Sequence, residues 1–173
     1  LKTMAGTALT ETRKGVTMVM DMLSSSNFKT GAMNLAAAQF DFSSLVQRIC
    51  GELANNAKEK GLSLACSITP AAYPVRGDEE KIREHVVRNL VDNAIRYTNQ
   101  GSIEVKLARS ERAIILAIAD TGVGIAPEDL PKLFTEGGKG SHSSEVNPSS
   151  TGFGLSIAKQ ITEAHGGVIW AES

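Results

Sequence analysis

The clearest pattern in the chain is a pair of aliphatic segments separated by a short polar turn. Residues 102–109 and 113–119 are rich in valine, isoleucine, leucine and alanine, and the polar residues 110–112 lie between them. This pattern predicts a β-hairpin, because β-branched and aliphatic runs joined by a short polar link are typical of paired strands. Residues 62–68 alternate apolar and polar positions and predict a further strand.

Other segments have helical spacing. Apolar residues recur on one face after Asp41 and Ser43, which predicts a helix capped by one of these two residues and ended by Gly61. Asp78 is followed by two glutamates, and negative charges suit the helix dipole at an N-terminus. This pattern predicts a long helix that starts here and runs to about Thr98. The remaining predicted elements are a helix over residues 152–164, a helical turn over 130–134, and strands over 35–40, 73–76 and 168–172.

The N-terminal segment has a pattern of its own. Residues 1 to about 26 place small and apolar residues at alternating spacings of four and three, a weak heptad stripe typical of a helix packing on partner helices. A surface helix folded onto its own domain is the alternative. Serines end the predicted helix and a linker follows. We therefore expect a partial helix and linker over residues 1–31 and a main domain over residues 32–173.

Residues 135–151 form a long polar segment of glycine, serine, asparagine and proline with almost nothing apolar. Loops longer than about 12 to 15 residues without structure of their own are uncommon in compact domains unless they are lids or are disordered. We therefore expect a mobile loop here.

Length, charge and cysteine content narrow the class of protein. The chain has 173 residues, of which 42% are hydrophobic, enough for one domain with a real core and an appendage. Its 18 basic and 19 acidic residues nearly balance, so we expect no nucleic acid or membrane partner for this segment. The longest apolar run, residues 113–119, is far too short to span a bilayer. Cys50 and Cys66 have no paired spacing, which indicates neither a disulfide framework nor a zinc site and favours a reducing, cytoplasmic setting.

Four polar side chains share one face of the long predicted helix. Asn89 and Asn93 are four residues apart, and Arg96 and Tyr97 follow three and four residues later. Helical spacing therefore places two amides, a cation and a ring on one face. An amide pair on a helix next to the core is usually structural, so a functional interpretation requires further ligand-binding features.

Two glycine-containing segments supply such features. Asp120 directly follows the second hairpin strand and precedes Gly122 and Gly124, whose missing side chains let the backbone approach a ligand. Gly152 and Gly154 lie at the start of the third predicted helix, where free backbone amides can hold phosphate. Neither segment is a dinucleotide-binding fingerprint or a P-loop.

Taken in order, these segments resemble the nucleotide-binding boxes of the catalytic domain of sensor histidine kinases, a branch of the Bergerat or GHKL ATPase superfamily. The resemblance covers about residues 35–173, and four boxes in the right order and spacing are not expected by chance. Residues 1–31 are similar to the second helix of the family's dimerisation and phosphotransfer hairpin. The N box corresponds to Asn89 to Ala94 with Arg96 and Tyr97, the first glycine box to Asp120 to Gly124, the F box to Leu133 and Phe134, and the second glycine box to Ser150 to Ile157.

The resemblance implies roles for these residues in binding ATP and Mg²⁺. Asp120 would accept a hydrogen bond from the adenine amino group, where guanine presents a carbonyl. Asn93 would give a side-chain oxygen to Mg²⁺, with Asn89 beside the ion as the catalytic residue. Tyr97 would pack near the base or ribose, and Arg96 would face the phosphates. The other nucleotide-binding residues implied are Gly122, Gly124, Ile125, Lys139, Thr151, Gly152, Phe153, Gly154 and Leu155.

The family's fold is a two-layer α/β sandwich, a mixed sheet with helices on one face, to which the N-terminal helix would be added. Residues 135–151 would be the ATP lid. Lys139 lies near where the family places a basic lid residue that reaches the γ-phosphate, and a solvated loop lysine is the equal alternative. The stretch after Phe134 departs from the family's aromatic-rich pattern, which leaves the F-box contact open.

The activity implied is transfer of the γ-phosphoryl group of ATP to a histidine on the first hairpin helix. We expect this piece to lack that helix and therefore to bind ATP without self-phosphorylation, and we expect a full-length parent that is a homodimer with a response regulator as partner. ATP-hydrolysing relatives of the gyrase or chaperone type place a glutamate at the Asn89 position, and an amide cannot serve as that base. A non-catalytic nucleotide-binding scaffold stays open. His165 ends a predicted helix, where a cation suits the dipole, and is expected to be structural.

Overall fold

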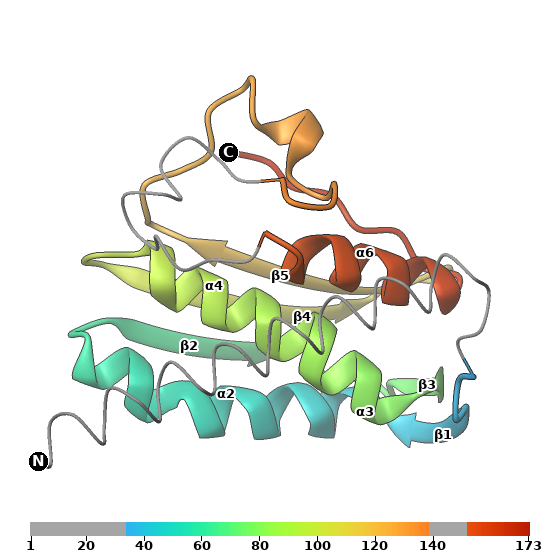
Figure 1. The fold of residues 1–173 in the computed structure, drawn as a ribbon. Coiled ribbons are helices and arrows are strands. Elements are labelled where there is room, and N and C mark those ends of the chain that lie inside the picture. The colour runs from blue at the N-terminus through green and yellow to red at the C-terminus, as the bar shows by residue number, and fades with distance from the viewer. Residues whose placement is uncertain (1–33, 139–151) are drawn as a thin grey trace, which may run out of the picture.

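The computed structural model describes residues 34–138 and 152–173 (Figure 1). The predicted N-terminal helix, the boundary near residue 30 and most of the predicted lid therefore lie outside the described residues. In chain order the elements are β1 (Ala38–Asp41), α2 (Phe42–Glu59), β2 (Ser63–Ile68), β3 (Pro74–Gly77), α3 (Glu79–Lys81), the π-helical η1 (Ile82–Arg88), α4 (Asn89–Tyr97), β4 (Ser102–Arg109), β5 (Ile114–Asp120), the 3₁₀ turn η2 (Leu130–Lys132) and α6 (Gly154–Ala164).

The described part of the chain forms two layers. A mixed sheet has the strand order β2-β4-β5, with β2 parallel and β5 antiparallel to the central β4. β1 and β3 form a separate antiparallel pair. Helix α2, the long helix made of α3, η1 and α4, and helix α6 lie over one face of the sheet (Figure 1). This arrangement confirms the predicted two-layer α/β sandwich with a mixed sheet and helices on one face.

The hydrophobic core lies between the helices and the sheet. Along β4, buried residues alternate with exposed or half-buried ones, so one face of this strand is turned toward the helices. Burying an aliphatic side chain of this size stabilises a fold by roughly 1.5 to 3 kcal/mol, so this interface is the main source of stability. The buried core includes Leu45, Ile49 and Leu53 from α2, Val87 and Val91 from the long helix, Ile103, Val105 and Leu107 from β4, and Ile157 and Ile161 from α6.

The predicted start of α2 is confirmed, and Asp41 rather than Ser43 is the cap. The Asp41 carboxylate accepts from the backbone amide of Ser44 at 3.1 Å and from that of Ser43 at 3.4 Å. Hydrogen bonds from the Ser44 and Ser43 hydroxyls and amides lower the pKa of Asp41. At the other end, Lys60 caps the helix and Gly61 turns the chain with a φ of 75°, where a side chain would be strained.

The predicted long helix is present from Glu79 to Tyr97, with Asp78 as its cap. Its middle part, η1, is π-helical, which the apolar spacing did not predict. The wider turns end at Arg88, directly before Asn89. Single π-helical turns inside α-helices occur frequently at functional sites, and this one lies immediately before the candidate amide pair.

The predicted strand over residues 168–172 is wrong, because the structure has no strand there. Val168 and Trp170 are 78% and 61% exposed. An alternating apolar pattern becomes a strand only where a neighbouring strand supplies hydrogen bonds, and in the described part of the chain β5 makes no ladder with this segment. Instead, the Ser173 hydroxyl accepts a hydrogen bond from the Ile125 amide at 2.8 Å.

Buried Asp78 joins the segment before β1, the first turn of the long helix and the C-terminal end of helix α6. Its carboxylate accepts from the amides of Ala36 and Lys81 at 3.1 and 3.0 Å and from Lys81 Nζ at 2.8 Å. Its own amide donates to His165 Nε2 at 2.9 Å, while His165 Nδ1 donates to the Ile161 carbonyl at 2.7 Å. A backbone amide can only donate, so Nε2 of His165 is the acceptor in this contact. His165 thus bonds both α6 and the start of the long helix, in keeping with the structural role expected for it.

Gly77 packs directly against this histidine. A Cβ atom at Gly77 would lie 2.5 Å from Cδ2 and 2.9 Å from Nε2 of His165. We predict that Gly77→Ala lowers the free energy of unfolding by about 1 to 3 kcal/mol, because the ring must move away and the Asp78 amide loses its acceptor. Urea unfolding followed by circular dichroism measures the effect.

The matched control is Gly51→Ala in the middle of α2, where a Cβ atom would have no neighbour within 4 Å. This change is expected to stabilise the protein by roughly 0.5 to 1 kcal/mol, because alanine favours a helix over glycine. Equal stability of Gly77→Ala and the native chain would contradict the packing described for His165.

The Asp78 contacts also predict a dependence of stability on pH. Burial raises the pKa of Asp78, but hydrogen bonds from Lys81 and Ala36 and the Lys81 charge outweigh burial and lower it below 3.8. A carboxyl whose pKa is lower in the folded state stabilises the fold above its unfolded pKa and loses this contribution as pH falls through the folded pKa. We predict that Asp78→Asn is less stable than the native chain at neutral pH and that the two converge below pH 3.8. A difference in unfolding free energy that stays constant with pH would contradict this account.

Candidate functional site

The two predicted asparagines lie together at the start of α4. Asn93 Nδ2 donates to Asn89 Oδ1 at 3.4 Å, and both residues are half-buried. Asn89 Nδ2 is buried and has no hydrogen-bond partner among the described residues. A buried donor without an acceptor costs roughly 1 to 3 kcal/mol, so this amide marks a place for an acceptor atom of a ligand.

The second glycine segment lies directly on this asparagine pair. A Cβ atom at Gly154 would lie 2.8 Å from Asn89 Oδ1 and 3.2 Å from Asn89 Nδ2, so only glycine permits the contact. Helix α6 begins at Gly154 and not at the predicted Gly152, because Gly152 has a left-handed φ of 74°. The contact brings the first turn of α6, whose backbone amides have no preceding helical carbonyls, next to the buried Asn89 amide.

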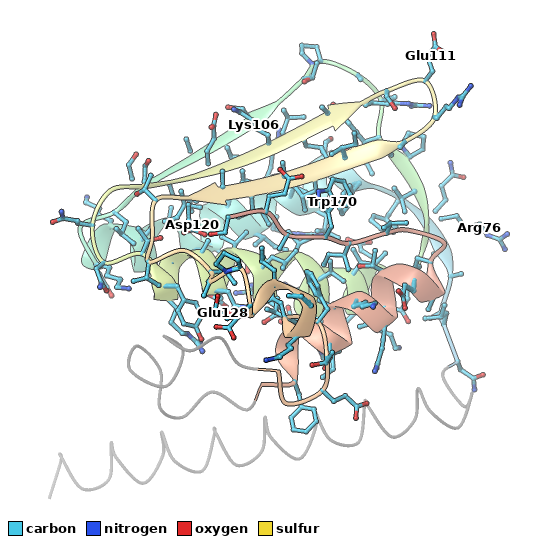
Figure 2. The ribbon with its side chains drawn as sticks, turned by 90° about the horizontal axis from the view of Figure 1, so that it is seen from above. Arg76, Lys106, Glu111, Asp120, Glu128 and Trp170 are labelled. Atoms are coloured by element: carbon cyan, nitrogen blue, oxygen red, sulfur yellow. The ribbon has the colours of Figure 1, made fainter. Side chains whose placement is uncertain are left out.

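The first glycine segment lies at the other end of α4. The Val123 amide donates to the Tyr97 carbonyl at 3.3 Å, and a Cβ atom at Gly122 would lie only 2.5 Å from that carbonyl oxygen. Figure 2 shows Asp120 at the end of β5, on the side of the helix layer. The predicted segments are therefore packed on one helix, the asparagines and Gly154 at its start and Gly122 at its end.

Asp120 has a contact that the sequence did not predict. Its Oδ1 accepts from the Gly122 amide at 2.9 Å. Asp and Asn side chains commonly bond the backbone two residues ahead in turns, which is the signal that could have revealed it. Oδ2 accepts no hydrogen bond from the described residues. One oxygen of the Asp120 carboxylate therefore orders the loop.

The two polar ends of the site are separated along the helix. Asn89 and Tyr97 are eight positions apart, about 12 Å at 1.5 Å per residue. Tyr97 is half-buried and Arg96 is exposed. Among the described residues, no hydrogen bond joins Asp120 to the asparagine pair. The arrangement suits an elongated ligand with polar groups at both ends.

The other predicted site residues belong to the two glycine segments and the predicted lid. Gly124 has a left-handed φ of 69°, and the next residue, Ile125, is half-buried. A Cβ atom at Gly152 would lie 3.0 Å from the Gly137 Cα, so the two ends of the predicted lid meet. Phe153 packs against the hydrophobic core. Leu155 is half-buried, and Lys139 and Thr151 lie outside the described residues.

Asp92 is a charged group in this region that the sequence reasoning missed. Asp92 lies between Asn89 and Asn93 in the sequence of α4, and it is half-buried. Burial raises the pKa of Asp92, and the charges of Arg88 and Arg96 only partly oppose this effect. The predicted phosphate-facing Arg96 therefore also acts on a neighbouring carboxyl. An acidic residue within an otherwise apolar and amide-rich helical segment was the available signal.

The described residues contain no group of three or more histidine, cysteine, aspartate or glutamate side chains able to hold a metal ion. The predicted Mg²⁺ contact thus depends on amide oxygen and on a ligand. Among the same residues, no helix has both the length and the apolar character needed to cross a membrane.

Comparison with solved structures shows the fold to be shared. The Acinetobacter baumannii histidine kinase AdeS superimposes with a TM-score of 0.76 at 26% identity, over 95% of this chain and 74% of AdeS. Full-length ShkA, solved in complex with AMPPNP, superimposes with a TM-score of 0.81 at 24% identity, over 96% of this chain and 35% of ShkA.

Sequence relatives and a family model agree with the structural likeness. The chain is 32% identical over 163 residues to the adaptive-response sensory kinase SasA of Synechococcus sp. (strain JA-3-3Ab), covering 93% of this chain and 42% of the relative. It is 30% identical to two-component system protein A of Emericella nidulans, covering 88% of this chain and 23% of the relative. The chain thus spans less than half of these relatives. The model of the histidine kinase-, DNA gyrase B- and HSP90-like ATPases matches residues 77–173, from the start of the long helix through both glycine segments, and the chain belongs to this family.

Proposed function

We propose that this chain is the catalytic domain of a sensor histidine kinase, and that it donates the γ-phosphoryl group of ATP to a histidine on a phosphotransfer domain. The observation that carries the proposal is the buried Asn89 Nδ2 without an acceptor, held against Gly154 at the start of α6. Such a donor beside the amides of a helix N-terminus suits a phosphate oxygen.

At one end of the site, Asp120 would select adenine. Its Oδ1 is occupied by the Gly122 amide, and its second oxygen would accept a hydrogen bond from the adenine amino group. Guanine presents a carbonyl oxygen at that position, and two acceptors cannot pair. Tyr97, whose carbonyl bonds the same loop, would lie beside the base or ribose.

At the other end, Asn89 and the first amides of α6 would hold phosphate. Asn93 fits a role with Mg²⁺, because its Nδ2 is turned to Asn89 and its oxygen accepts no hydrogen bond from the described residues. Mg²⁺ takes few protein ligands and is completed by phosphates and water, so one amide oxygen suffices. When bound, the ion would neutralise charge on the phosphates. Lys139 and Thr151 stay predicted contacts from the lid.

The second candidate function is hydrolysis of ATP, which the family name also covers. In ATP-hydrolysing relatives of the gyrase or chaperone type, a glutamate at the Asn89 position activates water. The Asn89 amide cannot accept a proton at neutral pH, so the residues present favour transfer to a histidine over hydrolysis.

The partners follow from the proposed activity. We propose a phosphoacceptor histidine domain, a response regulator and a homodimeric, cytoplasmic catalytic region in the full-length parent. The histidine kinase ThkA, solved in complex with the response regulator TrrA, has a related fold at 20% identity and a TM-score of 0.72, which supports this class of partner.

The experiment that tests the activity is incubation of the chain with γ-labelled ATP, Mg²⁺ and a separately supplied phosphotransfer hairpin domain. We expect acid-labile label on the hairpin, and none on a hairpin whose acceptor histidine is replaced by glutamine. Release of inorganic phosphate without labelled hairpin would indicate hydrolysis instead. Nucleotide binding with neither product would indicate a scaffold.

Asp120→Asn tests the adenine role separately. Asparagine keeps an oxygen for the Gly122 amide, but its amino group can oppose the adenine amino group. Loss of a charge-assisted hydrogen bond predicts an ATP affinity about ten- to a hundredfold weaker, with little change in the thermal midpoint. Calorimetry and thermal unfolding measure both. Unchanged ATP affinity would contradict the role, and loss of the fold would make Asp120 structural.

A further inference from the structure

The C-terminal end of α4 lies beside the first glycine segment. Each of the last four backbone carbonyls of this helix, residues 94–97, accepts a hydrogen bond. The Ala94 carbonyl accepts from the Thr98 hydroxyl at 2.7 Å and from the Thr98 amide at 3.2 Å. The Tyr97 carbonyl accepts from the Val123 amide at 3.3 Å. Helix ends ordinarily leave such carbonyls to water, so this end of α4 is held by the protein itself.

The two carbonyls between these are held by one cation from another element. Lys60 Nζ donates to the Ile95 carbonyl at 2.8 Å and to the Arg96 carbonyl at 2.7 Å. Lys60 is the C-cap of α2, so these bonds tie the end of α2 to the end of α4. Both bonds are charge-assisted, and a cation at the negative end of a helix is additionally stabilised by the helix dipole.

The end of α4 supports the loop that carries Asp120. Gly122 lies so close to the Tyr97 carbonyl that a Cβ atom would be 2.5 Å from its oxygen. The Gly122 amide in turn holds Asp120 Oδ1 at 2.9 Å. A shift of the last turn of α4 would therefore move Gly122 and, with it, the carboxylate that is proposed to meet adenine.

We infer that Lys60 is a positioning residue for the adenine end of the nucleotide site. It acts through the Ile95 and Arg96 carbonyls, which fix the last turn of α4, on which the loop from Asp120 to Val123 rests. The asparagine pair and Gly154 lie at the opposite end of α4. Lys60 therefore contributes to recognition of the base and leaves phosphate binding unchanged. This inference rests on the proposed adenine role of Asp120.

The test replaces Lys60 with residues that keep its length or its charge. Lys60→Met removes the charge and the donors, and Lys60→Arg keeps both. Lys58→Met is the matched control, since Lys58 is exposed in the last turn of the same helix and its side chain bonds no described residue. Calorimetric affinities for ATP and GTP are measured for each variant, below its thermal midpoint.

We expect Lys60→Met to weaken ATP affinity about fivefold or more. This loss is a part of the roughly ten- to hundredfold loss of affinity expected when the adenine hydrogen bond of Asp120 is removed. GTP affinity is expected to change little, so the preference for ATP over GTP falls. Lys60→Arg is expected to restore most of the preference, and Lys58→Met to leave it at the native value. A purely structural role would weaken both nucleotides alike and leave the preference unchanged.

The outcomes separate this inference from the proposed function. If the native chain prefers ATP and Lys60→Met keeps that preference, the role of Lys60 is overturned and the proposed function stands. If the native chain binds neither nucleotide, the proposed function itself fails. If Lys60→Met does not fold, Lys60→Gln, which keeps one uncharged donor, is measured instead, and an unchanged preference in that variant overturns the inference.

Discussion

The close approach of Gly154 to Asn89 is the contact on which the rest of the site depends. No side chain stands between the start of α6 and the amide pair of α4, so the backbone amides of one helix and the buried side-chain amide of the other meet at one place. The opposite end of α6 is fixed as well, because His165 accepts the amide of Asp78, the cap of the long helix. Helix α6 is thus joined at both of its ends to the long helix.

Helix α4 is the common reference for both polar ends of the site. Gly154 permits close packing at the start of α4, and Gly122 permits it at the end. Lys60 at the end of α2 bonds two carbonyls in the last turn of α4. In the proposed binding mode, the length of the helix would set the separation between the base and the phosphates. A rigid helix with a different partner at each end explains how sequence segments far apart form one elongated site.

Local patterns explain what the sequence could predict. The hairpin, the start of α2 and the extent of the long helix follow from apolar spacing and capping, which act over a few residues, and the boxes follow from the order of short motifs. The apolar spacing gave no signal for the π-helical η1. The Lys60 bonds and the bond of Asp78 to His165 join segments far apart in the sequence and carry no local signal. The strand expected at residues 168–172 failed for the same reason, since its alternation could not reveal whether a neighbouring strand would pair with it.

The central claim is that nucleotide binding requires the direct contact between Gly154 and Asn89. The most direct measurement is the ATP affinity of the Gly154→Ala variant by calorimetry. Gly51→Ala is the control, because it also adds a Cβ atom within a helix but places it where it has no neighbour within 4 Å. The account predicts about a tenfold or greater loss for Gly154→Ala, because the methyl group must displace the Asn89 amide, and a native affinity for Gly51→Ala. Native ATP affinity in a folded Gly154→Ala variant would contradict it.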